Sequence, residues 1–210
     1  MSVRIDPAGR PFVGGAILLA VASGFGLGWV ASLPCAALAV FFAFFFRDPD
    51  RKPVAGDGVV LSPADGRVIV AGPALPDASP PGEWQQISIF LSPMDVHVNR
   101  VPAAGRVTKV AYTPGRFLPA YRPEAGATNE RSEIWIEDRG RTVVARQVVG
   151  VLARRVVCRV TPGTHVQAGD RYGIMKFGSR MDVFVPLTAE LRVAPGDVVR
   201  GGETVIAVLH

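Results

Sequence analysis

The hydrophobic and polar residues divide the chain into an apolar N-terminal region and a longer region of mixed pattern. Not one residue from Phe12 to Phe46 is charged. A helix needs about 20 apolar residues to cross a bilayer, so this run is too long for one helix and slightly short for two full spans. It is also too long for the apolar part of a cleaved signal peptide. We therefore expect residues 1–46 to form a retained membrane anchor.

The anchor is expected to be a helical hairpin. Pro34 offers a break, which predicts one helix near residues 12–31 and a second near 35–46. Arg10 precedes the apolar run and Arg47 follows it, and positive charge on both flanks favours a hairpin with both ends in the cytoplasm. Whether such a hairpin spans the bilayer or lies in its surface stays open. Either arrangement would hold the chain at the cytoplasmic face of the cell membrane.

From residue 47 onward the pattern changes to short apolar or alternating runs, each bounded by glycine, proline or aspartate. Such runs predict β-strands. The predicted strands cover residues 59–61, 66–70, 86–91, 105–111, 133–137, 142–145 and 156–160, together with the runs on either side of Gly178-Ser179. Residues 148–154 alone suggest a helix. Residues 47–210 are therefore expected to form a mostly β domain of sandwich or barrel type.

Two stretches near the C-terminus repeat one pattern. Residues 162–175 and residues 195–208 each contain a Pro-Gly turn, a short strand, a second glycine turn and another strand. This pattern resembles the half-motif of biotinyl and lipoyl carrier domains, and the segment from Ser62 to Val70 has a similar sequence. The expected β-fold therefore contains biotinyl- or lipoyl-like half-motifs.

Charge and composition narrow the kind of partner. The 210-residue chain has a net charge of +5, but its basic residues are scattered and form no aromatic-interleaved face of the kind that binds nucleic acid. A mild positive balance suits an anionic membrane surface better. Cys35 and Cys158 stand alone, and the chain has only three histidines. These numbers argue against a disulfide framework and against a metal site.

Three local motifs carry the candidate chemistry. They are SPADG, which contains Asp65; LSPMDVHVNR, which contains Asp95 and His97; and KFGSR, which contains Gly178 and Ser179. Each motif alone is typical of an ordinary turn. Together they supply a carboxylate, an imidazole and a hydroxyl, the parts of a base-assisted nucleophile. In that arrangement His97 takes the proton of Ser179 and Asp65 orients the imidazole, while Asp95 is either a second carboxylate of the site or an exposed turn residue.

The order and spacing of these motifs resemble the short prokaryotic type of phosphatidylserine decarboxylase proenzyme. The resemblance runs from about residue 47 to the C-terminus, and the apolar hairpin fits it too. Asn129 and Glu130 fall within it and, with Asp95, are candidates for the substrate site. Longer members of the family have a second histidine three residues after the first, which is usually given the self-cleavage role. Here that position is Arg100, so no separate processing histidine carries over.

The resemblance implies a self-cleaving enzyme. Ser179 would attack the Gly178 carbonyl, and the chain would split into a β chain of residues 1–178 and an α chain of residues 179–210. These chains would stay together as a heterodimer, with a higher oligomer left open. Ser179 would become a covalent pyruvoyl group, so neither a metal nor a separate cofactor is expected. The amine of phosphatidylserine would condense with this group as a Schiff base, and loss of carbon dioxide would give phosphatidylethanolamine.

Two other classes of function remain as alternatives. A biotinyl- or lipoyl-like carrier would use Lys176, although Ile174 and Phe177 depart from the usual carrier sequence around that lysine. A membrane-anchored β-domain without catalysis would need none of the three motifs. An enzyme of the expected kind would run on a gel as two fragments, whereas a carrier or an adaptor would stay whole. Phosphatidylserine and archaetidylserine share one headgroup chemistry, so the motifs do not distinguish between them.

Overall fold

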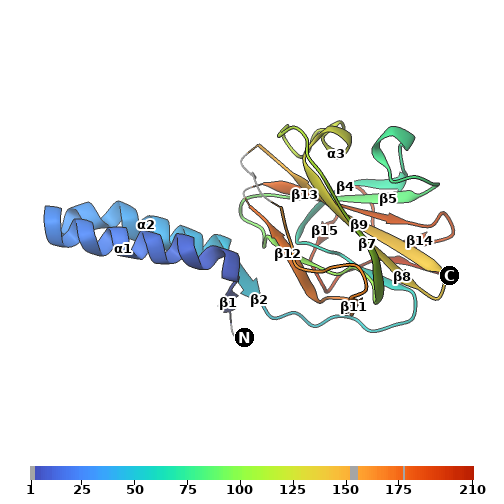
Figure 1. Cartoon of the computed structure of the whole chain (residues 1–210), viewed down its shortest axis with the longest axis horizontal. Helices are drawn as coiled ribbons and strands as arrows, with labels where there is room; N and C mark the ends of the chain where they lie inside the picture. Colours follow the sequence, from blue (N-terminus) through green and yellow to red (C-terminus); the bar gives the residue numbers. More distant parts are fainter. Residues whose placement is uncertain (1–2, 152–155, 177) are drawn as a thin grey trace. The chain divides into compact units, whose positions relative to one another are not determined.

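The computed structural model describes residues 3–151, 156–176 and 178–210. The chain divides into two compact units, Met1–Asp50 and Arg51–His210 (Figure 1). The boundary follows Asp50 because the segment after the second helix pairs with the N-terminal strand and so belongs to the first unit.

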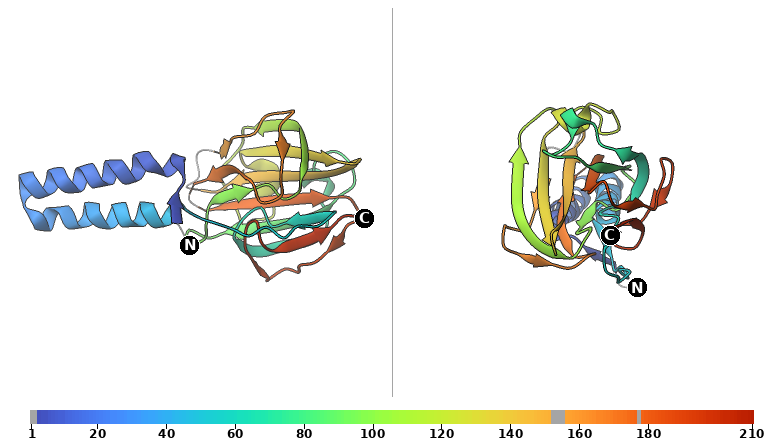
Figure 2. Two further views of the ribbon diagram at one scale, coloured as in Figure 1. Left: turned by 90° about the horizontal axis from the view of Figure 1, so that it is seen from below. Right: turned by 90° about the vertical axis from the view of Figure 1, so that its right-hand side faces the viewer.

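The first unit is a hairpin of two apolar helices (Figure 2). Its elements are β1 (Val3–Ile5), η1 (Pro7–Gly9), α1 (Arg10–Leu27), α2 (Trp29–Phe45) and β2 (Arg47–Pro49), and β1 pairs antiparallel with β2. The ring of Phe12 packs on those of Phe42 and Phe46, with centroids 5.5 and 5.3 Å apart. Many of the large apolar side chains on both helices are exposed, including Phe25 and Trp29. A helical hairpin with such a surface is suited to lipid rather than to water.

The break between the two helices lies at Gly28, so the predicted break at Pro34 is wrong. Gly28 has a φ of +92°, which glycine adopts without steric cost, and the chain reverses there. Pro34 lies inside α2, close to its beginning. Its missing N–H removes one hydrogen bond, to the carbonyl of Val30, and α2 continues past this loss. Among the described helices, Pro7–Leu27 is long and apolar enough to cross a membrane, and Trp29–Phe45 is shorter.

The second unit consists of antiparallel strands in three sheets, which confirms the mostly β fold (Figure 1). The largest sheet has the order β11-β7-β8-β9-β13-β5-β4-β15, and the smaller sheets have the orders β10-β12-β6 and β14-β16-β3. The strands are β3 (Val59–Leu61), β4 (Gly66–Pro73), β5 (Gln85–Leu91), β6 (Val98–Arg100), β7 (Gly105–Thr113), β8 (Arg131–Asp138), β9 (Arg141–Val149), β10 (Val156–Cys158), β11 (His165–Val166), β12 (Arg171–Met175), β13 (Ser179–Val185), β14 (Glu190–Leu191), β15 (Val198–Val199) and β16 (Val205–Val208). Two short helical turns, η2 (Pro76–Ala78) and α3 (Ala125–Thr128), interrupt the loops.

Every strand predicted from the sequence pattern is present. The helix predicted over residues 148–154 is wrong at its start, because Val148 and Val149 are the last residues of β9. Both are fully buried, and an apolar run in a central strand cannot be distinguished from a short buried helix by its pattern. Residues 152–155 lie outside the described residues.

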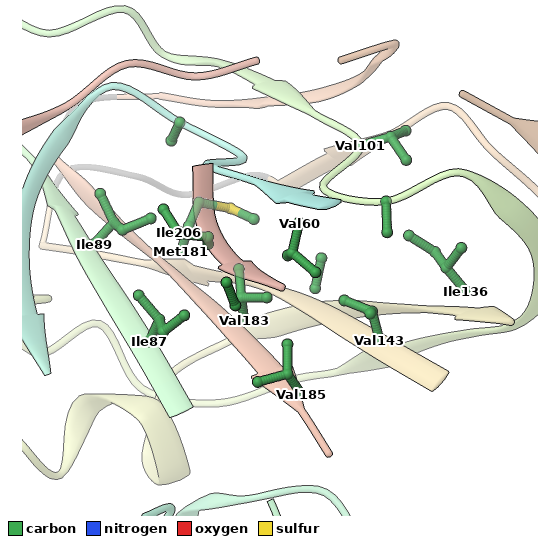
Figure 3. Packing of buried hydrophobic residues seen from close by; sticks show 14 of the residues in the cluster. Val60, Ile87, Ile89, Val101, Ile136, Val143, Met181, Val183, Val185 and Ile206 are labelled. Atoms are coloured by element: carbon green, nitrogen blue, oxygen red, sulfur yellow. The ribbon is translucent and has the colours of Figure 1, made fainter. Parts of the chain in front are cut away.

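The core lies on one face of β13 and its neighbours. Met181, Val183 and Val185 alternate along β13 and pack with Ile87 and Ile89 of β5 (Figure 3). The residues between them point to the opposite face, yet all seven residues of β13 are buried. The strand is therefore covered on both faces.

The repeated pattern near the C-terminus corresponds to two successions of strands, β11 followed by β12 and β15 followed by β16. β11 and β15 add to opposite ends of the large sheet, while β12 and β16 continue into the two small sheets. Gly105 pairs with Val166 and Gly66 pairs with Val199, and these two glycines have φ values of 153° and 152°. The SPADG loop, which ends at Gly66, and the loop that ends at Gly105 therefore hold equivalent places in the fold.

Candidate active site

Ser179 begins the central strand β13, between Leu91 of β5 and Val149 of β9. Its side chain is fully buried, and its Oγ has no hydrogen-bond partner among the described residues. An unsatisfied buried hydroxyl is unfavourable for stability, and in a native fold it commonly indicates a functional position. Gly178, directly before it, has a φ of +72°, which glycine adopts easily. The sheet therefore presents a hydroxyl that has no partner among the described residues, directly after a glycine of positive φ.

The carbonyl of Gly178 packs against a second glycine. Gly150 follows β9, directly after the residue opposite Ser179. A Cβ atom added to Gly150 would lie 2.3 Å from the Gly178 carbonyl oxygen, far inside normal contact. Only glycine at position 150 lets the two backbone segments approach in this way.

His97 lies at the backbone amide of Gly178, on the other side of this residue from the carbonyl. Its Nδ1 is 2.9 Å from the carbonyl oxygen of Asp95. Because a carbonyl only accepts hydrogen bonds, Nδ1 must carry a hydrogen, and the other ring nitrogen, Nε2, faces a backbone N–H. The amide of Gly178 donates to this Nε2 at 3.4 Å. The fully buried imidazole therefore turns its Nε2 toward the amide of Gly178, the residue before Ser179.

Asp95 closes the turn that leads to His97. Its carboxylate accepts hydrogen bonds from the backbone amide of Ser92 at 2.8 Å and from the Ser92 hydroxyl at 2.7 Å. The carboxylate thus fixes the turn, while the main-chain carbonyl of the same residue sets the tautomer of His97.

Asp65 does not contact His97 in the part of the chain that the structure describes. Its carboxylate binds Arg51 Nη2 at 2.7 and 2.9 Å and accepts from the amide of Gly201 at 2.8 Å. Arg51 also binds Glu203 at 3.3 Å. Arg51 thus binds the carboxylate that was expected to orient His97. The backbone carbonyl of Asp95 makes the orienting contact with the imidazole instead.

Asn129 and Glu130 support the strand end beside Ser179. The fully buried side chain of Asn129 donates to the carbonyls of Leu118 and Val149, each at 2.8 Å, and accepts from the Leu118 amide at 3.0 Å. The carbonyl of Glu130 accepts from the amide of Val149 at 3.1 Å. Both residues therefore fix the long loop after β7 against the segment that leads to Gly150.

A buried ion pair follows Ser179 on the other face of β13. Arg180 Nε lies 2.5 Å from Asp182 Oδ1, and both side chains are almost completely buried. Arg180 also donates to the hydroxyl of Ser88 at 3.0 Å and to the carbonyl of Arg122 at 3.4 Å. These bonds fix the residue after the nucleophile to β5 and to the long loop.

Sequence reasoning missed several polar residues of this region. Gln147 donates to Asn99 Oδ1 at 2.8 Å, inside the fold, and Arg51 binds Asp65. Gln147 had a signal, since it is a polar residue within the apolar run VVARQVVGV. Asn99 also had a signal in the sequence, since it is a polar residue two positions after His97 in the motif LSPMDVHVNR. Within the ranges that the structure describes, no group of three or more His, Cys, Asp or Glu side chains could hold a metal ion.

A β-fold with a buried serine, a buried histidine and a glycine of positive φ between them defines a class of enzyme with an internal nucleophile. The chain matches the sequence model of one family, phosphatidylserine decarboxylase, over residues 38–207. It is 43% identical to the phosphatidylserine decarboxylase proenzyme of Nitrosomonas europaea over 203 residues, which cover 96% of this chain and 94% of that protein. The proenzyme of Geotalea daltonii is also 43% identical, over 99% of this chain and 97% of its own.

This chain belongs to the phosphatidylserine decarboxylase family. A third relative, the proenzyme of Granulibacter bethesdensis, is 43% identical over 97% of this chain and 84% of its own length. The matches confirm the family resemblance that the motifs SPADG, LSPMDVHVNR and KFGSR indicated, and with it the prediction of an enzyme.

Proposed function

We propose that this protein cuts its own chain between Gly178 and Ser179 and then decarboxylates phosphatidylserine to phosphatidylethanolamine and carbon dioxide. The observation that carries the proposal is the buried Ser179 hydroxyl, which has no partner among the described residues and follows a peptide bound by His97. The name of the relatives, decarboxylase proenzyme, supports both parts.

In the first stage, Ser179 Oγ attacks the carbonyl carbon of Gly178. A C–O bond forms and the C–N bond breaks, so the peptide becomes an ester, and His97 Nε2 carries the proton from the hydroxyl to the freed nitrogen. Loss of the Ser179 Cα proton then breaks the Cβ–Oγ bond. Gly178 is left with a carboxylate and residue 179 with a carbon–carbon double bond. Addition of water and loss of ammonia give a pyruvoyl group at position 179.

The surroundings of Ser179 fit such a group. The residue lies at the start of a buried strand, its side chain has no described partner, and Arg180 fixes the strand directly after it. A pyruvoyl group supplies the electron sink for loss of carbon dioxide. His97 holds a proton at the same place and returns it to the substrate carbon that loses its carboxylate.

Asp65 is proposed to act in the cleavage stage by holding Arg51 and the amide of Gly201 in place, and not by orienting His97. It binds the amide of Gly201, which would belong to the α chain, while its partner Arg51 would belong to the β chain. The carboxylate therefore ties the two future chains together at the loop before β4, the strand next to the edge strand β15. Asp95, Asn129 and Glu130 support the walls of the substrate site through the contacts given above.

The apolar hairpin suits a lipid substrate. α1 is long and apolar enough to cross a membrane, and Arg10 and Arg47 lie at the two ends of the hairpin. Positive charge at both ends supports a position at the cytoplasmic face, next to anionic lipid.

Replacement of Ser179 tests the proposal. Purified wild-type protein should give masses for residues 1–178 and 179–210, with the smaller chain blocked to Edman degradation. Ser179→Ala should remain one inactive chain because it has no nucleophile. Ser132→Ala is the matched control, since Ser132 is another buried serine of the large sheet and should leave cleavage intact. A Ser179→Ala chain that still splits would refute the proposed cleavage.

A further inference from the structure

Two buried amide side chains lie inside the second unit and take no part in the cleavage chemistry. Asn99 of β6 and Gln147 of β9 are both fully buried. Gln147 Nε2 donates to Asn99 Oδ1 at 2.8 Å and to the carbonyl of Val157 at 3.3 Å. Because that carbonyl can only accept, the bond to Val157 fixes the nitrogen end of Gln147, and the bond to Asn99 then fixes the oxygen end of Asn99.

This arrangement leaves one donor and one acceptor unused. Asn99 Nδ2 and Gln147 Oε1 are buried and have no hydrogen-bond partner among the described residues. Unsatisfied buried polar atoms destabilise a fold, and natural proteins contain few of them. Leucine and methionine would fill similar volumes without that loss. Packing therefore does not explain the pair, whereas binding of a ligand would.

Asn99 borders the candidate active site through His97. His97 directly precedes β6, and Asn99 is the middle residue of this strand, so the two residues are separated by one position. Gly173 of β12 lies opposite Asn99, and its lack of a side chain lets the amide of Gln147 come close to the strand. A Cβ atom at Gly173 would lie 2.7 Å from Gln147 Nε2.

Gln147 borders the same site through Ser179. In the ladder of β9 and β13, Gln147 lies opposite Met181, and Ser179 lies opposite Val149. Ser179 and Gln147 are therefore diagonal neighbours on one face of the sheet, a spacing of roughly 7 Å between backbones. Each member of the pair thus lies two positions from a residue of the candidate active site, Asn99 along the chain from His97 and Gln147 across the ladder from Ser179.

We propose that Asn99 and Gln147 form the subsite that recognises the amino-acid headgroup of the substrate. This inference rests on the proposed function. A serine headgroup carries a carboxylate and an amine on one carbon, and the pair offers one donor and one acceptor. Asn99 Nδ2 donates to the carboxylate, and Gln147 Oε1 accepts from the amine. The product keeps its amine and loses its carboxylate, so it makes only the contact with Gln147, and this difference favours its release.

Binding to processed enzyme tests the subsite without turnover. Borohydride reduces the ketone at position 179 to an alcohol, so the enzyme binds headgroups without reacting with them. Short-chain dihexanoyl phosphatidylserine and dihexanoyl phosphatidylethanolamine would then be titrated by calorimetry. Asn99→Leu should weaken binding of the serine lipid about tenfold or more, the loss expected for one hydrogen bond to a charged group. It should leave the affinity for the ethanolamine lipid unchanged within about twofold, because that lipid has no carboxylate.

Two further variants complete the design. Gln147→Met should weaken binding of both lipids to a similar extent, because both carry the amine. Gln86→Met is the matched control: Gln86 is a buried amide of β5 that donates to Ser88 on the other face of the sheet. It should keep both affinities.

The outcomes separate this inference from the proposed function. Wild-type protein that neither cuts itself nor decarboxylates phosphatidylserine would refute the proposed function. Active wild type, combined with an Asn99→Leu enzyme that still prefers the serine lipid as strongly as wild type, would refute the subsite alone. If Asn99→Leu fails to process, Asn99→Ser and Gln147→Met decide the question. Wild-type affinities for both lipids in either variant would overturn the inference.

Discussion

The contact between Gly150 and the Gly178 carbonyl allows a sharp test of how strictly the cleaved peptide must be placed. In a Gly150→Ala variant the new Cβ would lie 2.3 Å from the carbonyl oxygen, whereas an ordinary contact begins at 3.4 Å. The two segments must therefore separate by about 1 Å. Gly150 does not have a positive φ, so alanine brings no backbone strain of its own. The substitution changes only the distance between the two segments.

We expect two effects of different size. Crowding of a packed interior costs about 1–3 kcal/mol of unfolding free energy. A displacement of about 1 Å at a reacting group can slow the reaction by about 100-fold. Cleavage should therefore be affected far more than stability. Intact-mass measurements over time after synthesis would give the cleavage rate, and urea unfolding would give the stability.

A core variant away from the site separates the two effects. Ile136 is almost completely buried in β8, and Ile136→Val should cost about 0.5–1.5 kcal/mol while cleavage proceeds at the wild-type rate. The reasoning fails if Gly150→Ala cuts itself as fast as wild type, or if Ile136→Val is slowed to the same degree.

Two further predictions concern the buried ion pair and a buried thiol. Arg180→Gln should lower the free energy of unfolding in urea by about 3–5 kcal/mol, because it leaves the charge of Asp182 buried without its cation. Replacing both residues with apolar ones should recover most of this loss. A double variant as unstable as Arg180→Gln would contradict the prediction. Burial raises the pKa of the Cys158 thiol, so a Cys35→Ser protein should react with iodoacetamide at neutral pH more slowly than a free cysteine, and the rate should rise as the pH approaches the raised pKa. A neutral-pH rate equal to that of a small thiol would count against this account.

The sequence pattern was most informative where regular alternation extended over several residues. Met181, Val183 and Val185 were sufficient to predict β13, because one face of a buried strand repeats every second residue. β6 was missed because it is short and carries two polar residues, Asn99 and Arg100, whose burial depends on partners elsewhere in the chain.

Pairings between distant residues were beyond what local patterns specify. The motifs indicated His97 and Ser179, and the structure brings His97 to the peptide before Ser179. The motifs could not show that Arg51 would bind Asp65, because an ion pair depends on how loops meet in space rather than on composition. The error at Pro34 has a different cause: proline near the start of a helix removes only one hydrogen bond, and the neighbouring Gly28 offered an easier place to turn.

The position of β13 has a consequence for how the cut protein would unfold and refold. The segment from residue 179 onward supplies a central strand between β5 and β9, an edge strand on β4 and the middle strand of a small sheet. The uncut chain folds as a single molecule at any dilution. Two fragments cut at Gly178–Ser179 could part only if the shared core came apart, and afterwards they would have to find each other again by diffusion. Cutting would therefore turn reversible folding into a one-time event, after which survival depends on the rate of unfolding rather than on an equilibrium.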